Sequence, residues 1–265
     1  MDTKKVIAYI TDWLRGYCER ARQQGFVVGV SGGIDSAVVS ALCARTGLPV
    51  ICLEMPIHQA PAQVQRALDH IAHLRKQHPN VRMETVKLTP VFDALVKELM
   101  RSEDQQLTDL ALANARSRLR MTALYYVAGL HRSLVAGTGN KVEDFGVGFF
   151  TKYGDGGVDL SPIADLTKTE VYAVGRELGI IESIMQAKPT DGLWGDDRSD
   201  EDQIGATYPE LEWAMDLRDR NIDATKLELT ERQRHALAIF DQRRAANRHK
   251  MEPIPVCIIP PDVRG

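Results

Sequence analysis

Short apolar segments alternate with helical segments through the first half of this chain, and this order limits the fold more than any other feature. Apolar character predicts strands at residues 26–30, 49–55, 81–88 and 133–137. Helical periodicity and helix-start residues predict helices at 37–43, 60–78, 107–131 and from Thr89 (as N-cap) onward. Apolar strands that alternate with helices form a parallel sheet covered on both faces. We therefore predict an α/β fold, a doubly wound parallel sheet with helices on both faces.

The two ends of the chain and one internal segment have a character of their own. Apolar residues at helical spacing predict an N-terminal helix within residues 1–25, ended by Gly25. Residues 188–208 are polar, acidic and contain glycine, which predicts a loop that is mobile or closes over a site. Prolines exclude a helix from residues 251–265, so we expect an extended tail. The length suits one core, and we expect a single domain over 1–265.

Composition excludes several classes of protein. The formal net charge of −3 provides no global positive field for nucleic-acid binding, so an anionic ligand must meet local positive groups. The sequence contains no run of about eighteen apolar residues, the length that would predict a membrane span. The four cysteines form no C-x-x-C pair and no metal-binding spacing, which is typical of a reducing compartment. We expect a cytoplasmic protein that binds neither membranes nor nucleic acid.

The strongest local signal lies directly after the first predicted strand. Residues 31–36 read Ser-Gly-Gly-Ile-Asp-Ser and lead into a predicted helix. Adjacent glycines let the backbone approach a phosphate closely, and the helix N-terminus favours an anion. Asp35 would repel that phosphate unless a cation such as Mg²⁺ bridges the two. A simple strand-to-helix turn is the plainer interpretation, but the whole hexapeptide in this position favours phosphate binding. Neither a Walker A loop nor a G-x-G-x-x-G dinucleotide loop is present.

This S-G-G-x-D-S loop resembles the pyrophosphate loop of the N-type ATP pyrophosphatases, whose fold is of the adenine nucleotide α hydrolase type. That superfamily includes NAD⁺ synthetases, GMP synthetases, asparagine synthetases and tRNA-thiolating enzymes. Its members cleave ATP between the α and β phosphates and adenylate an oxygen of their substrate. The loop therefore implies the nucleotide chemistry and leaves the substrate open.

A second motif narrows the resemblance to one family. Residues 137–144 read Gly-Thr-Gly-Asn-Lys-Val-Glu-Asp, and residues 148–159 contain Gly-Phe-Phe-Thr-Lys-Tyr-Gly-Asp-Gly. Pro162 and Leu166-Thr167-Lys168 follow in order. This stretch is similar to that of the ammonia-dependent NAD⁺ synthetases, and further matches at 114–121, 188–190 and 249–250 extend it over nearly the whole chain.

The resemblance implies roles for particular residues. Contacts to ATP are implied for Gly29, Ser31, Gly32, Gly33, Asp35, Ser36, Thr138, Lys168 and Thr190. Contacts to deamido-NAD⁺ are implied for Arg118, Lys152, Asp159, His249 and Lys250. Mg²⁺ would bind Asp35 together with Glu143. Because the spacing between Gly137 and Gly148 is one residue longer than in the family pattern, Asp144 is the alternative ligand, and Glu143 is favoured.

The implied reaction adenylates the nicotinate carboxylate of deamido-NAD⁺ with ATP and then amidates it with ammonia. Asp35 and Lys168 would act in the first step, through charge neutralisation and positioning. Asp155, in the Lys-Tyr-Gly-Asp-Gly stretch, is the candidate that binds ammonium and takes its proton. The phosphate loop begins at residue 31, so we expect no glutaminase domain and free ammonia as the nitrogen source. Family resemblance also implies a homodimer, with residues 107–131 as a candidate part of its interface.

Two alternatives stay open, and some residues are predicted to have no role in a site. Another ATP pyrophosphatase, a GMP synthetase-like enzyme or a tRNA-modifying ligase, would share the loop; the net charge and unpaired cysteines disfavour the latter. A nucleotide-binding module without activity would share the fold, but Asp35 and Glu143 argue against it.

We predict that Tyr125-Tyr126 packs within its helix. Four histidines without metal-ligand neighbours are predicted to lie on the surface: His58, His70, His73 and His78.

Overall fold

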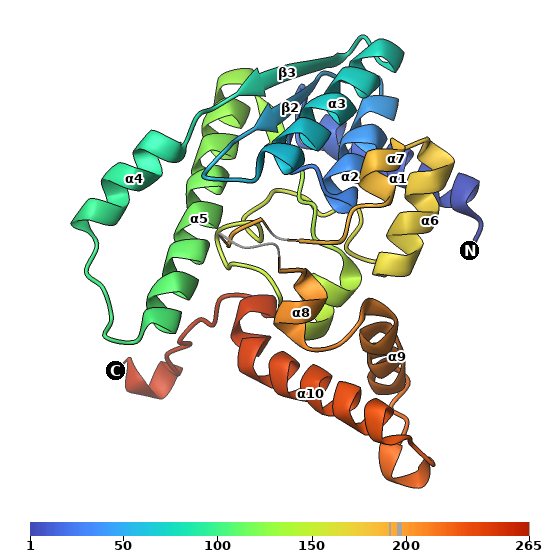
Figure 1. The fold of residues 1–265 in the computed structure, drawn as a ribbon, viewed down its shortest axis with the longest axis vertical. Helices are drawn as coiled ribbons and strands as arrows, with labels where there is room; N and C mark the ends of the chain where they lie inside the picture. Colours follow the sequence, from blue (N-terminus) through green and yellow to red (C-terminus); the bar gives the residue numbers. More distant parts are fainter. Residues whose placement is uncertain (191, 195–197, 265) are drawn as a thin grey trace.

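A four-stranded parallel sheet forms the centre of the molecule (Figure 1). The computed structural model describes residues 1–190, 192–194 and 198–264. The strands are β1 (Gly25–Gly29), β2 (Val50–Glu54), β3 (Val81–Thr85) and β4 (Ser133–Val135), in the order β3-β2-β1-β4. Phe26 of β1 pairs with Val50 of β2 on one side and Leu134 of β4 on the other. The strand order reverses between β1 and β4, which is where ligands bind in such sheets.

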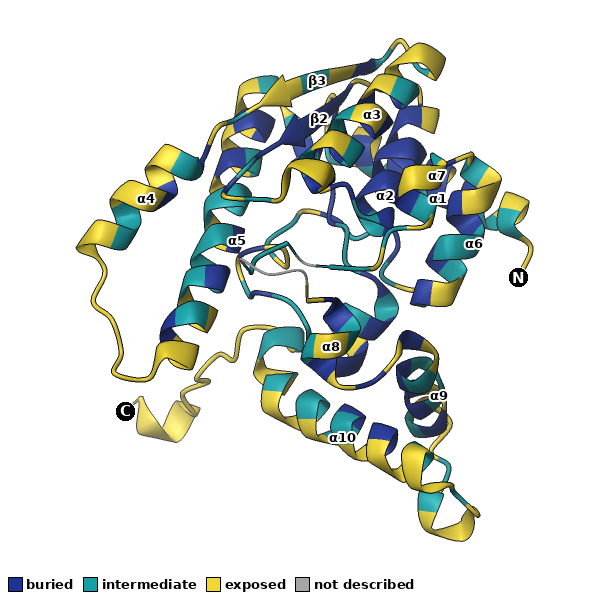
Figure 2. Cartoon of the chain, in the orientation of Figure 1, coloured by how far each residue is buried: buried dark blue, intermediate teal, exposed yellow. Residues whose placement is uncertain are grey.

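Helices cover both faces of the sheet, as the alternation of elements predicts. One face packs against α1 (Thr3–Arg20), α2 (Ile34–Arg45), α3 (Pro61–Gln77), α6 (Lys168–Leu178) and α7 (Glu182–Met185). The other face packs against α4 (Thr89–Glu98) and α5 (Gln105–His131). Helix α2 is dark blue over most of its length in Figure 2, because it lies between the sheet and the outer helices. No helix among the described residues is long and apolar enough to cross a membrane.

A third apolar cluster lies beyond the sheet. It joins the π-helix η1 (Lys141–Val147), α8 (Asp200–Ile204), α9 (Tyr208–Asp219) and α10 (Glu231–Met251), with α9 and α10 at the bottom of Figure 1. Two 3₁₀ turns, η2 (Ala224–Lys226) and η3 (Pro261–Val263), complete the elements of the described chain. After α10 the chain has no helix or strand until η3, and it is exposed (Figure 2). The extended tail predicted for 251–265 is thus interrupted, because Met251 ends α10 and residues 261–263 form η3.

The segment predicted as a loop at 188–208 contains more order than expected. Helix α8 lies within it, and Ser199 caps this helix by accepting a hydrogen bond from the backbone of Asp202. The reciprocal bond from the backbone N–H of Ser199 to the Asp202 carboxylate completes a capping box. Residues 191 and 195–197 of the predicted loop lie outside the described residues.

Several local predictions were wrong at element ends. Helix α1 ends at Arg20, and Gly25 instead opens β1, where an added Cβ would lie 2.0 Å from the Pro49 carbonyl oxygen. Thr89 is the first residue of α4 and not its N-cap; its hydroxyl donates to the Pro56 carbonyl, 3.2 Å away. Strand β3 is an edge strand and is exposed over half its length, so it is not apolar on both faces.

Two predictions about single side chains were also wrong: the surface position of His70 and the packing of Tyr126 within its helix. His70 is fully buried, because α3 directs it at α2, where its Nε2 lies 2.9 Å from the Ser40 hydroxyl. Tyr126 does not pack within α5 and is 69% exposed. Tyr125 does make a contact, since its hydroxyl donates to Asp159 at 3.1 Å.

Burial of His70 makes the fold sensitive to acid. Loss of hydration and, to a smaller extent, the nearby His73 together lower its pKa to about 4. The unfolded chain, with an ordinary histidine pKa near 6.5, therefore binds the proton first as the pH falls. The stabilising contribution is complete above pH 6.5 and is lost as the pH falls toward 4. Between pH 6.5 and 5 we expect the free energy of unfolding to fall by about 1.5 kcal/mol through this group.

Urea denaturation at several pH values measures this loss. The variant His70→Gln cannot titrate in this range, so its stability should change less between pH 6.5 and 5 than that of the wild type. The variant His235→Gln, at an exposed histidine of α10, serves as the control and should follow the wild type closely. Identical pH dependence in the wild type and His70→Gln would contradict the prediction.

Candidate functional site

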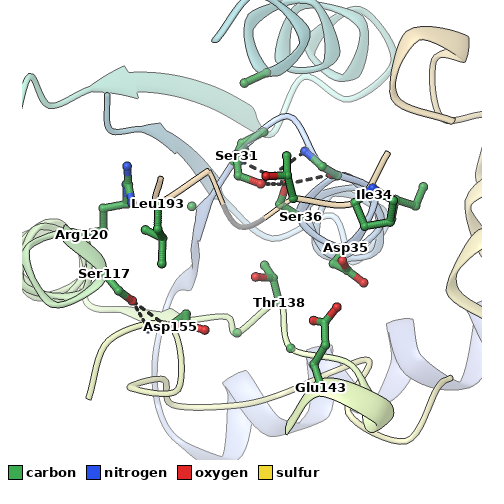
Figure 3. A pocket seen from close by; sticks show the side chains of 18 of the residues that line it. Ser31, Ile34, Asp35, Ser36, Ser117, Arg120, Thr138, Glu143, Asp155 and Leu193 are labelled. Carbon is green, nitrogen blue, oxygen red and sulfur yellow. Dashed lines mark hydrogen bonds between the residues drawn. The ribbon is translucent and has the colours of Figure 1, made fainter. Parts of the chain in front are cut away.

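The main cavity opens beyond the carboxyl ends of β1, β2 and β4, at the reversal of strand order. It encloses about 220 Å³ and is lined by the loop after β1, the end of β2, residues 136–139 after β4, and parts of η1 and α6. The segment 187–190 and Asp200 of α8 line it from the opposite side. Figure 3 shows Ser31, Asp35, Thr138, Glu143 and Asp155 around this space. Segments that are far apart in the sequence thus contribute to one site.

The glycine loop after β1 has the geometry of an anion cradle. The Ser36 hydroxyl lies 3.1 Å from that of Ser31, and the Ser31 hydroxyl accepts from the Gly33 backbone N–H at 3.3 Å. Helix α2 begins immediately afterwards, so its unpaired N–H groups point at the same space. Gly32 has φ +83°, and an added Cβ would lie 2.5 Å from the Gln63 carbonyl oxygen of α3. Only glycine fits this turn, because both the dihedral angle and the neighbouring helix exclude a side chain.

Two acidic side chains and one lysine form the charged centre of the site. The Lys168 ammonium lies 2.6 Å from Asp35 Oδ2 and 2.9 Å from Glu143 Oε1, and the lysine side chain is 3% exposed. Asp35 belongs to the first turn of α2, Glu143 to η1, and Lys168 begins α6. Burial alone would lower the pKa of Lys168, but the two carboxylates outweigh it and raise that pKa. Lys168 is therefore a firmly protonated cation between two carboxylates.

Asn140 joins the two acidic segments. Its Nδ2 donates to Asp35 Oδ1 at 3.2 Å, while its Oδ1 accepts from the backbone N–H groups of Val142 and Glu143, each at 3.1 Å. It is fully buried and caps the N-terminus of η1. A single amide thus links the phosphate loop to the helix that carries Glu143. Sequence reasoning quoted Asn140 within its motif and gave it no role.

The charged centre suits a hard divalent cation that also binds phosphate oxygens. Mg²⁺ in nucleotide sites is commonly held by one or two carboxylates, with phosphates and water as the remaining ligands. Asp35 and Glu143 provide that donor set on one side of the glycine loop. No cluster of three or more histidine, cysteine, aspartate or glutamate side chains among the described residues forms a metal cage.

Asp144, the alternative metal ligand, lines the same cavity without contacting Lys168. Burial raises its pKa well above the usual range, and the neighbouring carboxylates of Glu143, Asp155 and Asp35 raise it further. The pKa of Glu143 is instead lowered, because Lys168 and a hydrogen bond from Tyr208 outweigh its burial. The surroundings therefore favour the ionised form of Glu143 and disfavour that of Asp144, which supports the choice of Glu143 as the ligand.

Asp155 lies on the far wall of the cavity from Lys168. Its Oδ1 accepts from the Ser117 hydroxyl at 2.7 Å and from the Thr151 backbone N–H at 3.0 Å (Figure 3). Burial raises its pKa, although these hydrogen bonds oppose the shift. A buried carboxylate with a raised pKa, fixed by two donors, is suited to bind a small cation and accept a proton.

The other residues predicted to contact ATP fall into place around the cavity. Gly29 and Thr138 line it, as does Thr190, whose hydroxyl donates to the Arg198 carbonyl at 3.3 Å. Gly32 is the exception among the predicted contacts, because it faces α3 and shapes the loop from behind.

The residues predicted to bind deamido-NAD⁺ separate into two groups, and none of them lines the cavity in the described part of the chain. Arg118 donates to the Lys152 carbonyl at 3.4 Å, and the Lys152 ammonium donates to the His249 carbonyl at 2.8 Å. Lys250 donates to the Phe150 carbonyl at 2.7 Å. These four residues form a positive patch that brings α5, the 149–153 segment and the end of α10 together.

Asp159 lies apart from this positive patch. Its Oδ2 accepts from the Val135 backbone N–H at 2.8 Å, and its Oδ1 accepts from Tyr125. Both oxygens therefore serve to close the end of β4. In this geometry, Asp159 fits a structural role, as hydrogen-bond acceptor at the end of β4, better than it fits ligand binding.

Several residues that line or support the site carried no signal in the sequence. Glu54 ends β2 and is buried at the cavity wall, where loss of hydration raises its pKa. Tyr208 lies behind Glu143, and Asp200 reaches the cavity from α8. Their positions depend on the packing of distant elements, so no local pattern could have revealed them. Ser117 shares the helical stretch that resembles the family, and its contact with Asp155 was missed.

The fold and the cavity together define a nucleotide-binding α/β protein with a pyrophosphate-type loop at the switch point of its sheet. The model of the NAD synthase family matches residues 6–254. This chain belongs to the NAD synthase family, which decides between the ATP pyrophosphatases that the sequence left open.

Individual relatives agree with this membership. The NH₃-dependent NAD⁺ synthetase of Carboxydothermus hydrogenoformans is 41% identical over 209 residues, covering 77% of this chain and 81% of that protein. The enzyme of the same name from Syntrophomonas wolfei is 34% identical and covers 100% of both chains. Among solved structures, the NMN synthetase from Francisella tularensis has a TM-score of 0.82 at 30% identity, over 98% of this chain and 99% of that one. The NH₃-dependent NAD synthetase from Campylobacter jejuni has a TM-score of 0.77 at 29% identity, over 97% and 100%.

Proposed function

We propose that this protein is an ammonia-dependent NAD⁺ synthetase. It adenylates the nicotinate carboxylate of deamido-NAD⁺ with ATP and amidates the product with ammonia, which yields NAD⁺, AMP and pyrophosphate. The observation that carries this proposal is the buried Asp35–Lys168–Glu143 centre beside a glycine loop in a member of the NAD synthase family. Phosphate chemistry requires positive charge and orientation at this point more than it requires a covalent group.

The residues of the site divide the first step between them. The loop amides and the N-terminus of α2 bind and orient the phosphates. Asp35 and Glu143 would hold Mg²⁺, which supplies charge neutralisation to the phosphate oxygens. Lys168 can stabilise the negative charge that develops on the departing pyrophosphate, because its ammonium is already desolvated and firmly protonated. The positive patch of Arg118, Lys152, His249 and Lys250 supports binding of an anionic substrate next to the cavity.

Asp155 is proposed for the second step. Ammonium is the dominant form of ammonia at neutral pH, so the nucleophile must lose a proton before it attacks the adenylate. Asp155 offers a buried carboxylate for that cation, and its raised pKa brings it closer to the range of a useful base. Burial lowers the pKa of Lys250, and the charges of Asp155 and Asp144 oppose this shift. This effect indicates that Lys250 lies near the same end of the cavity.

The nicotinate mononucleotide is a second candidate substrate. The specific observation in its favour is the extensive similarity to a solved structure described as an NMN synthetase. Both candidates present the same carboxylate to the same centre, and they differ in the AMP half, which deamido-NAD⁺ has and the mononucleotide lacks. Parallel assays with the two substrates therefore separate them without changing the proposed chemistry.

One prediction of the proposed function concerns turnover and the carboxylate of Asp35 in the glycine loop. Purified protein with ATP, Mg²⁺, deamido-NAD⁺ and an ammonium salt should form NAD⁺ and AMP in equal amounts, measured by chromatography. Asp35→Asn keeps the shape of the side chain but removes a charge at the phosphates, so turnover should fall by about 10²–10³-fold. Asp12→Ala, on the exposed face of α1, is the control and should be fully active. Absence of both products from folded wild-type protein, with either nucleotide substrate, would disprove the proposed reaction.

A second prediction isolates the ammonia step. Asn at position 155 can still accept from Ser117 and Thr151, so Asp155→Asn should preserve the local structure while removing the base. We expect kcat/KM for ammonia to fall by about 10²-fold with little change in the KM for ATP. The defect should shrink as the pH rises, because free ammonia then needs no base. Undiminished ammonia-dependent turnover at neutral pH would exclude this role of Asp155.

We also propose a homodimer in the cytoplasm, with α5 in the interface. Five large apolar or aromatic side chains of α5 are exposed in the single chain: Leu107, Leu110, Tyr125, Tyr126 and Leu130. A partner that covers α5 would remove this surface from water.

Sedimentation of wild-type protein at micromolar concentration should show a dimer. The double variant Tyr126→Glu/Leu130→Glu changes neighbouring positions on one face of α5 and should dissociate it. Tyr9→Glu, at an equally exposed tyrosine of α1, is the control and should leave the dimer intact. A wild-type protein that sediments only as a monomer would rule out the dimer.

A further inference from the structure

Tyr208 lies directly behind the charged centre without lining the cavity. It is the first residue of α9 and is 4% exposed, with its ring packed in the apolar cluster of η1, α8, α9 and α10. Its hydroxyl donates to Glu143 Oε1 and lies 3.3 Å from Asp200 Oδ2. A buried tyrosine hydroxyl normally has a hydrogen-bond partner, and both partners here are carboxylates; a phenylalanine would fill the volume of the ring without these contacts.

The same oxygen of Glu143 also receives Lys168. The lysine ammonium donates to Oε1 at 2.9 Å and lies 4.7 Å from the centroid of the Tyr208 ring. Tyrosine and lysine thus converge on Oε1, which orients the carboxylate, and Oε2 would be the oxygen that binds a cation. The ring also supplies a favourable surface for the ammonium, so Tyr208 contacts two of the three charged groups.

Tyr208 connects this centre to the predicted closing segment. Asp200 belongs to α8, and its backbone N–H donates to the Pro189 carbonyl at 3.0 Å, next to Thr190. The backbone N–H of Tyr208 donates to Glu201 Oε1 at 2.8 Å. The tyrosine is therefore attached at both its backbone and its hydroxyl to α8, whose Asp200 lines the cavity.

We propose that Tyr208 is a positioning residue that orients Glu143 for a divalent cation bound together with ATP. The proposal rests on the proposed ATP and metal site and adds to it a residue that touches neither substrate nor cation. Groups that hydrogen-bond to a metal ligand fix its orientation, and their loss commonly weakens metal binding by about 10–100-fold. A tyrosine that only filled space would give no such effect when its hydroxyl alone is removed.

The test is direct cation binding by Tyr208→Phe. Mn²⁺ binding is measured by electron paramagnetic resonance of the free ion, with an ATP analogue that carries a methylene group between the α and β phosphates. We expect the Kd for Mn²⁺ to rise about tenfold. The KM for Mg²⁺ in the amidation assay should rise in parallel, whereas the KM for the nicotinate nucleotide and the melting temperature should change little. Tyr17→Phe, in a half-buried tyrosine that packs on Trp13 far from the site, is the matched control.

A double-mutant cycle separates positioning from general destabilisation. Glu143→Gln should itself weaken Mn²⁺ binding, and adding Tyr208→Phe to it should have no further effect, because the hydroxyl acts through Glu143. Wild-type Mn²⁺ affinity in Tyr208→Phe, or additive effects in the double variant, would overturn the proposal. A wild-type protein that binds no Mn²⁺ with the analogue would disprove the metal site itself. That result is distinct from failure of the Tyr208 proposal alone, in which wild-type protein and Tyr208→Phe bind Mn²⁺ equally well.

Discussion

The site depends on one buried interaction, the Lys168 ammonium between the carboxylates of Asp35 and Glu143. Each of these ions loses several kcal/mol of solvation on burial, so none is stable there without the others. Lys168 is separated by 133 positions from Asp35 and by 25 from Glu143. The pairing therefore requires that α2, η1 and α6 meet at one point, and it links the assembly of the fold to the assembly of the site.

Two polar side chains surround this centre and keep it in one arrangement. Asn140 spans the gap between the phosphate loop and η1 with a single amide, and Tyr208 anchors the other side of Glu143. The π-helical form of η1 is itself uncommon, and such segments occur frequently at functional sites. Its last residue is followed by Gly148 with φ +65°, where an added Cβ would lie 2.4 Å from Asn247 of α10. The apolar cluster beyond the sheet thus supports the segment that carries Glu143 from behind.

The site was easier to predict than its supports, for a physical reason. Phosphate binding needs several backbone N–H groups from consecutive residues, so its signal is local and could be read from the loop at 31–36. Asn140 and Tyr208 act through contacts between elements, and their residue types alone carry no such information. The same reason explains the error at His70. Helical periodicity identifies one apolar face of α3, but burial of a polar side chain depends on which neighbour, here Ser40 of α2, meets it.

The sequence by itself determined the alternation of strands and helices, the phosphate loop and the family motif, because each rests on neighbouring residues and on periodicity. It also placed Asp35, Lys168 and Glu143 as the candidates for one centre through that resemblance. Only the tertiary structure decided how they meet: a lysine shared by two carboxylates, Asp144 and Asp155 set apart from it, and Asp159 occupied in closing β4. Distances between charges, and the loss of water around them, exist only once the helices have packed, and those two quantities decide which acid is ionised and which can accept a proton.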